Sequence, residues 1–196
     1  MGTGRMEAFS DGVLAIIITI MVLELHVPHG VELHDLLPLI PTIVSYLLSF
    51  IYIGIYWNNH HHMMHAVEHI NGGVLWANLH LLFWLSLVPF VTGWMGENHF
   101  APLPTAMYGV VLLMAGVAYF ILQQVIIRQQ GKGSVVAKAV GRDFKGKTSP
   151  VIYLCAIIAA FFSPALAGSL YALVALMWVI PDRRFERVLT DRNDRD

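Results

Sequence analysis

Long apolar runs, separated by short polar or turn-forming segments, recur along the 196-residue chain. A helix needs about 20 mostly apolar residues to cross about 30 Å of hydrocarbon. The pattern therefore predicts an all-α integral membrane protein, with one six-helix transmembrane domain over residues 1–196. In the last third, "SPALAG" separates two short apolar runs, because Pro164 and Gly168 favour a tight turn. The predicted spans are 8–26, 36–57, 73–95, 105–127, 150–163 and 166–180.

The basic residues support six crossings rather than five. With six spans, all twelve Lys and Arg residues fall on one side of the membrane, before the first span, in the loop 128–149 and in the tail 182–196. Joining 150–180 into a single span would export the five arginines of the tail. The positive-inside rule makes the basic side cytoplasmic. Both termini are therefore predicted to be cytoplasmic, in a multi-pass protein of the inner (plasma) membrane.

Composition narrows the function classes. Charged residues make up 13% of the chain and hydrophobic residues 57%, whereas soluble domains carry about 25% charged residues. The "FSD" motif of the first span does not recur near the fourth, so no internal repeat is evident. A central pathway lined by the first span must then come from several chains around a symmetry axis. No nucleophile–base pair or metal-ligand set appears within the spans, and we expect neither an enzyme nor a cofactor.

The first span carries an aliphatic stripe with one hydroxyl. At about 100° per residue, Ile16, Thr19, Ile20 and Leu23 share one side of the helix, while Ser10 and Asp11 point elsewhere. Such a stripe is compatible with ordinary lipid-facing or core surface. It is also compatible with a narrow hydrophobic constriction, which gates by dewetting and makes ions shed water.

Asp11 lies inside the membrane boundary, where an unpartnered charge costs roughly 2.5–3.5 kcal/mol or more. The third span offers polar partners, and His80 differs from Asp11 in depth by roughly 6 Å at 1.5 Å per residue. We therefore predict a structural polar cluster that pins the first span to the third. An alternative is a proton-relay or cation site. The cluster comprises Arg5, Ser10, Asp11, Asn78 and His80.

Two further motifs suggest ligands that we do not expect. "WNNHHHMMH", Trp57 to His65, would place His61, His65 and His69 on one helix face. A closed zinc site requires three or four ligands, and histidines in a cytoplasmic linker are easily solvated by water. We therefore predict no metal ion at this segment. The alternative is that the histidines sense pH. "GRDFKGKT", Gly141 to Thr148, fits the Walker A pattern but lacks the strand and α/β domain that nucleotide binding requires.

That basic loop is instead expected near anionic lipid, and neither nucleotide nor nucleic acid is a predicted ligand. On the opposite side lie acidic residues, beginning with Glu24 at the end of the first span. If several chains meet there, these carboxylates form a mouth that concentrates cations; otherwise they are scattered surface acids. The outer acidic residues are Glu24, Glu32, Asp35 and Glu97.

The first half of the chain resembles a known family. Arg5 followed by Phe9-Ser10-Asp11 is similar to the R-x-x-x-F-S-D motif of the endosomal and lysosomal potassium channel family, the transmembrane-protein-175 class. "YW..HH" at Tyr56 to His61 and "FWLSLVPF" at Phe83 to Phe90 resemble its second and third helices. Beyond the fourth span, the resemblance rests on helix count and spacing.

The resemblance implies a homotetramer of six-helix chains, as in the bacterial members. It implies that the first helix lines the pore, with Ile16 as the tightest ring and Thr19, Ile20 and Leu23 as the next pore-facing positions. The motif Arg, Ser and Asp would hold helices together near the cytoplasmic side. Partners would then be other copies of the chain, membrane lipid, K⁺ and other monovalent cations.

We therefore predict a passive, potassium-preferring cation channel. The T-V-G-Y-G selectivity sequence is absent from the chain. Preference for K⁺ would come from dehydration at the aliphatic ring, aided by Thr19, and should be imperfect. The alternative is a proton-coupled or cation secondary transporter that uses Asp11 and His80 in each protomer.

Overall fold

The structure of the protein, a computed structural model, describes residues 2–67, 69–131, 133–140 and 144–179. These residues form helices joined by short connections, in agreement with the predicted all-α class. In chain order the helices are α1 (Gly4–Leu23), the 3₁₀ helix η1 (Leu33–Leu39), α2 (Ile40–His65), α3 (Gly72–Ser86), α4 (Val88–Glu97), α5 (Pro102–Gln130), α6 (Val135–Val140), α7 (Phe144–Ala159) and α8 (Pro164–Val179).

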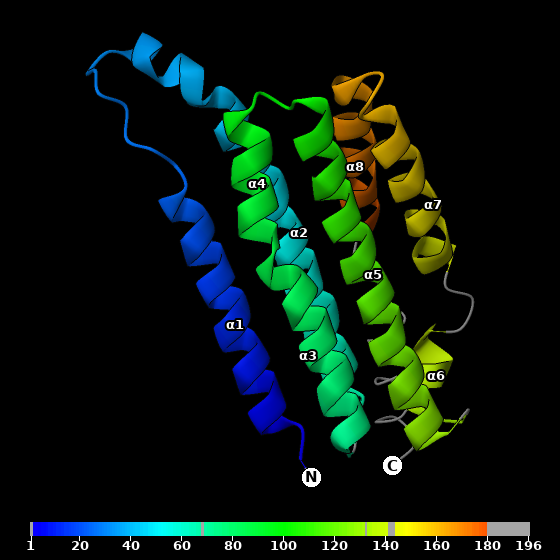
Figure 1. Cartoon of the computed structure of the whole chain (residues 1–196). Coiled ribbons are helices and arrows are strands. Elements are labelled where there is room, and N and C mark those ends of the chain that lie inside the picture. Colours follow the sequence, from blue (N-terminus) through cyan, green and yellow to red (C-terminus); the bar gives the residue numbers. More distant parts are fainter. Residues whose placement is uncertain (1, 68, 132, 141–143, 180–196) are drawn as a thin grey trace.

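The long helices lie side by side in one bundle, with α1 at one edge and α7 at the other (Figure 1). α1 contacts α2, α3 and α4, whereas α5 runs through the middle and contacts α3, α4, α7 and α8. The start of α1, the end of α5 and α6, which carry Arg5, Arg128 and Lys138, lie at the same end of the bundle (Figure 1). The start of α7, which carries Lys145 and Lys147, lies partway along α5 instead. Which face of the membrane the end with Arg5 occupies stays a prediction.

Four segments are long and apolar enough to cross a membrane, and they correspond to the first four predicted spans. They are Gly4–Leu23, Leu33–His65, Gly72–Glu97 and Pro102–Gln130. α7 and α8 correspond to the last two predicted spans, but each has 16 residues, fewer than the roughly 20 of a full span. The protein is a multi-pass membrane protein, and the count of six crossings stays a prediction.

The helices do not begin and end where the predicted spans do. α2 continues past residue 57 to His65, so the histidine-rich segment is helical rather than a linker. The third span is two helices, broken at Leu87, because Pro89 has no amide hydrogen and suits only the first turn of a new helix. α7 begins at Phe144, not 150. The predicted loop 128–149 is therefore largely helical where it is described.

The predicted turn at "SPALAG" was also misplaced. Pro164 is the first residue of α8 and Gly168 lies inside that helix, because proline is favoured at the first helical position. The chain reverses just before, and the Leu166 amide donates a hydrogen bond to Ser163 Oγ at 3.4 Å. The predicted tail 182–196 lies outside the described residues.

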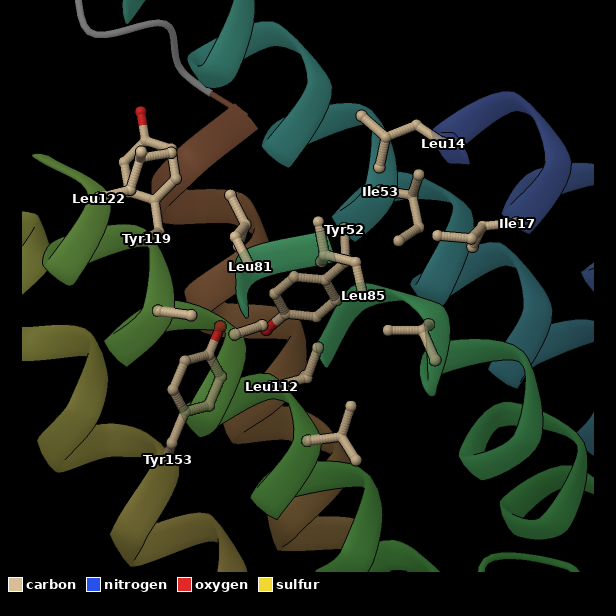
Figure 2. Packing of buried hydrophobic residues seen from close by; sticks show 14 of the residues in the cluster. Leu14, Ile17, Tyr52, Ile53, Leu81, Leu85, Leu112, Tyr119, Leu122 and Tyr153 are labelled. Atoms are coloured by element: carbon tan, nitrogen blue, oxygen red, sulfur yellow. The ribbon is translucent and has the colours of Figure 1, made fainter. Parts of the chain in front are cut away.

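The interior contains aliphatic side chains and several tyrosines whose hydroxyls are satisfied inside the bundle. Tyr52, at the centre of Figure 2, donates to the carbonyl of Tyr171 at 2.7 Å, and Tyr171 donates to the carbonyl of Thr105 at 3.0 Å. Ser49 lies 3.0 Å from the Tyr108 hydroxyl and 2.6 Å from Thr92 Oγ1. Hydrocarbon offers no water to buried polar groups, so these bonds fix how α2, α4, α5 and α8 pack.

Candidate functional site

The first helix has two chemically different faces. Leu14 and Ile17 are 3% exposed, and Figure 2 shows both directed from α1 toward Ile53 of α2. On the opposite side, Ile16 is 58% exposed and Leu23 is 79% exposed. The four positions of the predicted stripe, Ile16, Thr19, Ile20 and Leu23, are all exposed in the single chain. α1 is therefore anchored along one face, while its aliphatic face is left uncovered by the described residues of the chain.

Thr19 supplies the hydroxyl of this face. Its Oγ1 donates a hydrogen bond to the carbonyl of Ile16 at 2.8 Å. A hydroxyl carries one hydrogen and two acceptor lone pairs. Because the hydrogen is used within the helix, the oxygen is left to accept a hydrogen bond or to ligate a cation.

A buried polar network ties the N-terminal half of α1 to α2 and α3. Asn78 Nδ2 donates to Ser10 Oγ at 2.9 Å, and Ser10 donates in turn to the carbonyl of Met6 at 2.8 Å. His60 Nε2 lies 2.8 Å from Asn78 Oδ1; an amide oxygen only accepts, so His60 is the donor. The three polar side chains are 0–3% exposed. Each helix therefore contributes one member to a directional chain.

Asp11 has a different partner from the one predicted. Its Oδ1 accepts a hydrogen bond from Trp57 Nε1 of α2 at 3.0 Å. His80 Nε2 accepts from Trp84 Nε1 at 3.0 Å within its own helix, and no hydrogen bond or ion pair joins Asp11 to His80. The Arg5 side chain is exposed and makes no hydrogen bond or ion pair with any residue in the described part of the chain. Of the predicted cluster, the structure brings Ser10 and Asn78 together and leaves Arg5 and His80 apart.

His60 and Trp57 take part in these contacts but were not among the predicted residues. Both follow the helical spacing of Ile53 and Tyr56 on α2, since His60 lies seven residues after the buried Ile53. Extending the 3.6-residue period beyond position 57 would have placed His60 on the buried face. The polar residues "NNHHH" instead suggest the end of a helix.

An open groove of about 620 Å³ lies between α1 and α4, beside the aliphatic face. Ile16 and Ile20 line it, and Glu24 and Glu97 line it as well. A Cβ added at Gly93 would lie 3.3 Å from Glu24 Oε2, so the missing side chain lets this carboxylate approach α4 closely. The groove combines an aliphatic wall with two carboxylates.

The other acidic residues that are predicted to face outward, Glu32 and Asp35, lie at the start of η1. His34 lies 3.1 Å from Glu32 and 3.3 Å from Asp35. The same two acids form a capping box at the start of η1, which satisfies amide groups at the helix end. Their position therefore has a local structural cause, whereas Glu24 and Glu97 line the groove itself.

Neither the histidine-rich segment nor the described part of the Walker-like segment forms the closed ligand site that its motif suggests. In the part of the chain that the structure describes, no three His, Cys, Asp or Glu side chains converge on a point that could hold a metal ion. Of the Walker-like segment, residues 141–143 lie outside the described residues. Lys145 and Lys147 lie in the first turns of α7, and the Thr148 hydroxyl donates to the carbonyl of Phe144 at 2.8 Å.

Comparison with known proteins assigns the chain to a family. The profile of the family described as endosomal/lysosomal potassium channel TMEM175 matches residues 5–89. A potassium channel of Chryseobacterium sp. (strain P1-3) is 54% identical over 191 residues, which cover 97% of this chain and 100% of that protein. The chain belongs to the TMEM175 potassium channel family. The resemblance seen in the sequence is confirmed, and the TMEM175 assignment makes the protein a channel rather than an enzyme.

Two further proteins are similar to the chain at lower identity. The crystal structure of a lysosomal potassium-selective channel TMEM175 homolog from Chamaesiphon minutus superposes with a TM-score of 0.81 at 29% identity, covering 92% of this chain and 97% of that chain. A potassium channel of Streptomyces collinus is 34% identical over 125 residues, 60% of this chain and 61% of that protein. The residues of α1 and its supports, from Arg5 to His80, all lie within the stretch that the TMEM175 profile matches.

Proposed function

We propose that this TMEM175 protein is a passive, potassium-preferring cation channel of the inner membrane, in which α1 from each of four copies lines a central pore. The observation that carries the proposal is the exposed aliphatic face of α1, on a helix whose other face is held by the Ser10–Asn78–His60 network. Because this network fixes the rotation of α1 about its own axis, the exposed aliphatic face points in one direction. Around a symmetry axis, identical faces meet and enclose a path.

In this arrangement Ile16 forms the constriction. A ring of aliphatic side chains cannot replace the water around an ion, so a narrow ring excludes ions until it widens, and a passing ion must shed water. K⁺ loses its hydration more easily than Na⁺, which favours K⁺ without a T-V-G-Y-G filter. The Thr19 oxygen, whose hydrogen is donated to Ile16, compensates part of the lost hydration one turn further along. Ile20 and Leu23 continue the lining toward the outer end.

The outer end adds electrostatic attraction. Glu24 and Glu97 line the groove beside the stripe, and four copies would place eight carboxylates around the axis. A mouth of one charge sign raises the local concentration of counter-ions. Cations would therefore collect where they enter.

A secondary transporter that uses Asp11 and His80 is the alternative function. Such a site needs the two side chains to share an ion or a proton. Asp11 is bonded to Trp57 of α2 and His80 to Trp84 of α3. Because the two side chains have different hydrogen-bond partners, a structural role for Asp11 is favoured over an ion-coupling role.

Potassium flux into proteoliposomes tests the proposal. We expect K⁺ to move down its gradient without a proton gradient. Ile16→Asn should give a leakier and less selective pore. Ile158→Asn is the matched control, because Ile158 of α7 is 62% exposed, close to the 58% of Ile16, and should leave flux unchanged. If Ile16→Asn had no effect while Asp11→Asn abolished flux in a correctly assembled protein, the transporter would be the better explanation.

A further inference from the structure

The histidine-rich end of α2 carries a geometry that the channel function does not use. Because α2 continues to His65, His61 and His65 lie one helical turn apart on the same face. Their ring centroids are 4.3 Å apart with an interplanar angle of 83°. Neither ring makes a hydrogen bond or ion pair with any side chain in the described ranges, and His61 is half-buried while His65 is exposed. Both imidazoles are therefore accessible to an external ligand.

Two imidazoles at positions i and i+4 of a helix can bind one metal ion, as in the H-E-x-x-H arrangement. With metal–nitrogen bonds of about 2.0–2.1 Å, tetrahedral geometry holds two such rings about 5 Å apart. The observed 4.3 Å is close to this separation, so the two rings lie near enough to share one ion once their nitrogens turn toward it. Imidazole suits zinc, copper and nickel. We infer that His61 and His65 form a two-ligand site for a divalent transition-metal ion, with water in the remaining coordination positions.

The site differs from a closed metal centre, which the sequence does not predict. A structural zinc site uses four protein ligands, and the described residues supply no group of three. An ion that is bound by only two protein ligands exchanges readily, so it does not hold the fold together. Because the imidazoles must be neutral to bind, occupancy should fall as the pH is lowered.

Trp57 connects this pair to the first helix. Its ring stacks on His61, with centroids 5.8 Å apart and an interplanar angle of 19°. The same indole donates its hydrogen bond to Asp11 of α1 at 3.0 Å. A bound ion would lie next to the contact that ties α2 to α1. Trp57 is also a built-in fluorescence reporter, and the inference does not depend on which ions the channel conducts.

Titration of the full chain, purified without a polyhistidine tag, with Ni²⁺ or Cu²⁺ tests the site through tryptophan fluorescence. These ions quench an indole that lies close to them. We expect saturable quenching that a chelator reverses and that is largely lost in Trp57→Phe. Even outer-shell partners change metal affinity by about 10–100-fold. His61→Gln and His65→Gln should therefore each weaken the midpoint at least about tenfold.

His62→Gln is the matched control. His62 is adjacent in sequence, but it points to a different side of the helix, and its ring lies 5.8 Å from that of His61. The His62→Gln variant should bind Ni²⁺ or Cu²⁺ with the same midpoint as the unchanged protein. The inference is wrong if His61→Gln and His65→Gln bind like the unchanged protein, if quenching persists in Trp57→Phe, or if His62→Gln weakens binding as strongly. Size-exclusion chromatography of each variant shows whether it keeps its assembly.

Discussion

Asn78 of α3 donates a hydrogen bond to Ser10 of α1 at 2.9 Å, although 68 residues separate them in the chain. The same amide accepts from His60 of α2 through its oxygen. One buried side chain thus joins three helices near the N-terminal end of α1. This contact fixes the rotation of α1 about its own axis, and with it the direction in which Ile16 faces.

Removing this contact should destabilise the assembly more than removing a comparable surface hydroxyl. In Asn78→Ala, Ser10 loses a donor and His60 loses an acceptor, and a buried polar group left without a partner costs about 1–3 kcal/mol. We expect a lower melting temperature in detergent. A double-mutant cycle with Ser10→Ala should give a coupling energy near 1 kcal/mol, within the range found for hydrogen bonds between membrane helices.

Ser86→Ala provides the matched control for that cycle. Ser86 is exposed, and its hydroxyl donates only to the carbonyl of Phe83 in the same helix. Its loss should change the melting temperature little. Equal effects of Ser10→Ala and Ser86→Ala, with no coupling to Asn78, would contradict the assigned role of the network.

The packing of α5 against α8 should depend on a missing side chain. A Cβ at Gly109 would collide with the hydroxyl of Tyr171 and would lie 2.8 Å from a side-chain carbon of Ile157. Overpacking of this kind costs about 1–3 kcal/mol, so Gly109→Ala should unfold at lower temperature. Tyr171→Phe in the same chain should recover part of the loss, because it removes the colliding oxygen.

Gly116→Ala tests the same substitution in the same helix without the collision. Its added Cβ would meet only the Tyr56 hydroxyl, at 3.8 Å, an ordinary contact. Alanine also favours a helix interior over glycine by about 1 kcal/mol. Gly116→Ala should therefore be neutral or stabilising, and a loss equal to that of Gly109→Ala would show that the cause is not the contact with Tyr171.

Local periodicity predicted the face of α1 but not its partners. The angle between Ile16 and Thr19 follows from 3.6 residues per turn, and both side chains are exposed in the structure. The partner of Asp11 could not be predicted in this way. Depth along the membrane normal fixes the height of a side chain, but it does not fix which neighbouring helix that side chain faces. His80 was predicted from depth alone, yet it is bonded within its own helix.

The ends of helices were harder to predict than their existence. The polar residues after Trp57 suggested a linker, but the buried Met63 and Met64 keep α2 helical to His65. Tertiary burial decided the boundary there, as it often does when local preference is weak. Tertiary packing also places His60 in the core, where it is 3% exposed, although a polar side chain suggests a surface position.

The acidic outer end should influence conduction through charge rather than shape. Glu24→Gln removes a carboxylate that lines the groove but keeps the size of the side chain. The proposed channel should then carry less K⁺ at about 0.01 M salt, where charges act over roughly 30 Å, and nearly normal current at about 1 M, where they act over roughly 3 Å. Bilayer recordings at the two salt concentrations measure this difference. A reduction that is equal at both would indicate a change of pore shape instead.

Thr19 should affect selectivity between K⁺ and Na⁺ more than total flux. Thr19→Val keeps the shape of the side chain and removes the oxygen, which in the unchanged protein has already donated its hydrogen to Ile16. Losing a polar contact worth about 0.5–1.5 kcal/mol should lower the K⁺ to Na⁺ permeability ratio by up to about tenfold, since 1.4 kcal/mol corresponds to a factor of ten. Reversal potentials under a K⁺/Na⁺ bi-ionic gradient measure the ratio. Thr19→Ser retains the hydroxyl and should keep most of the selectivity, so an equal loss in both variants would mean that the methyl group, not the oxygen, sets the preference.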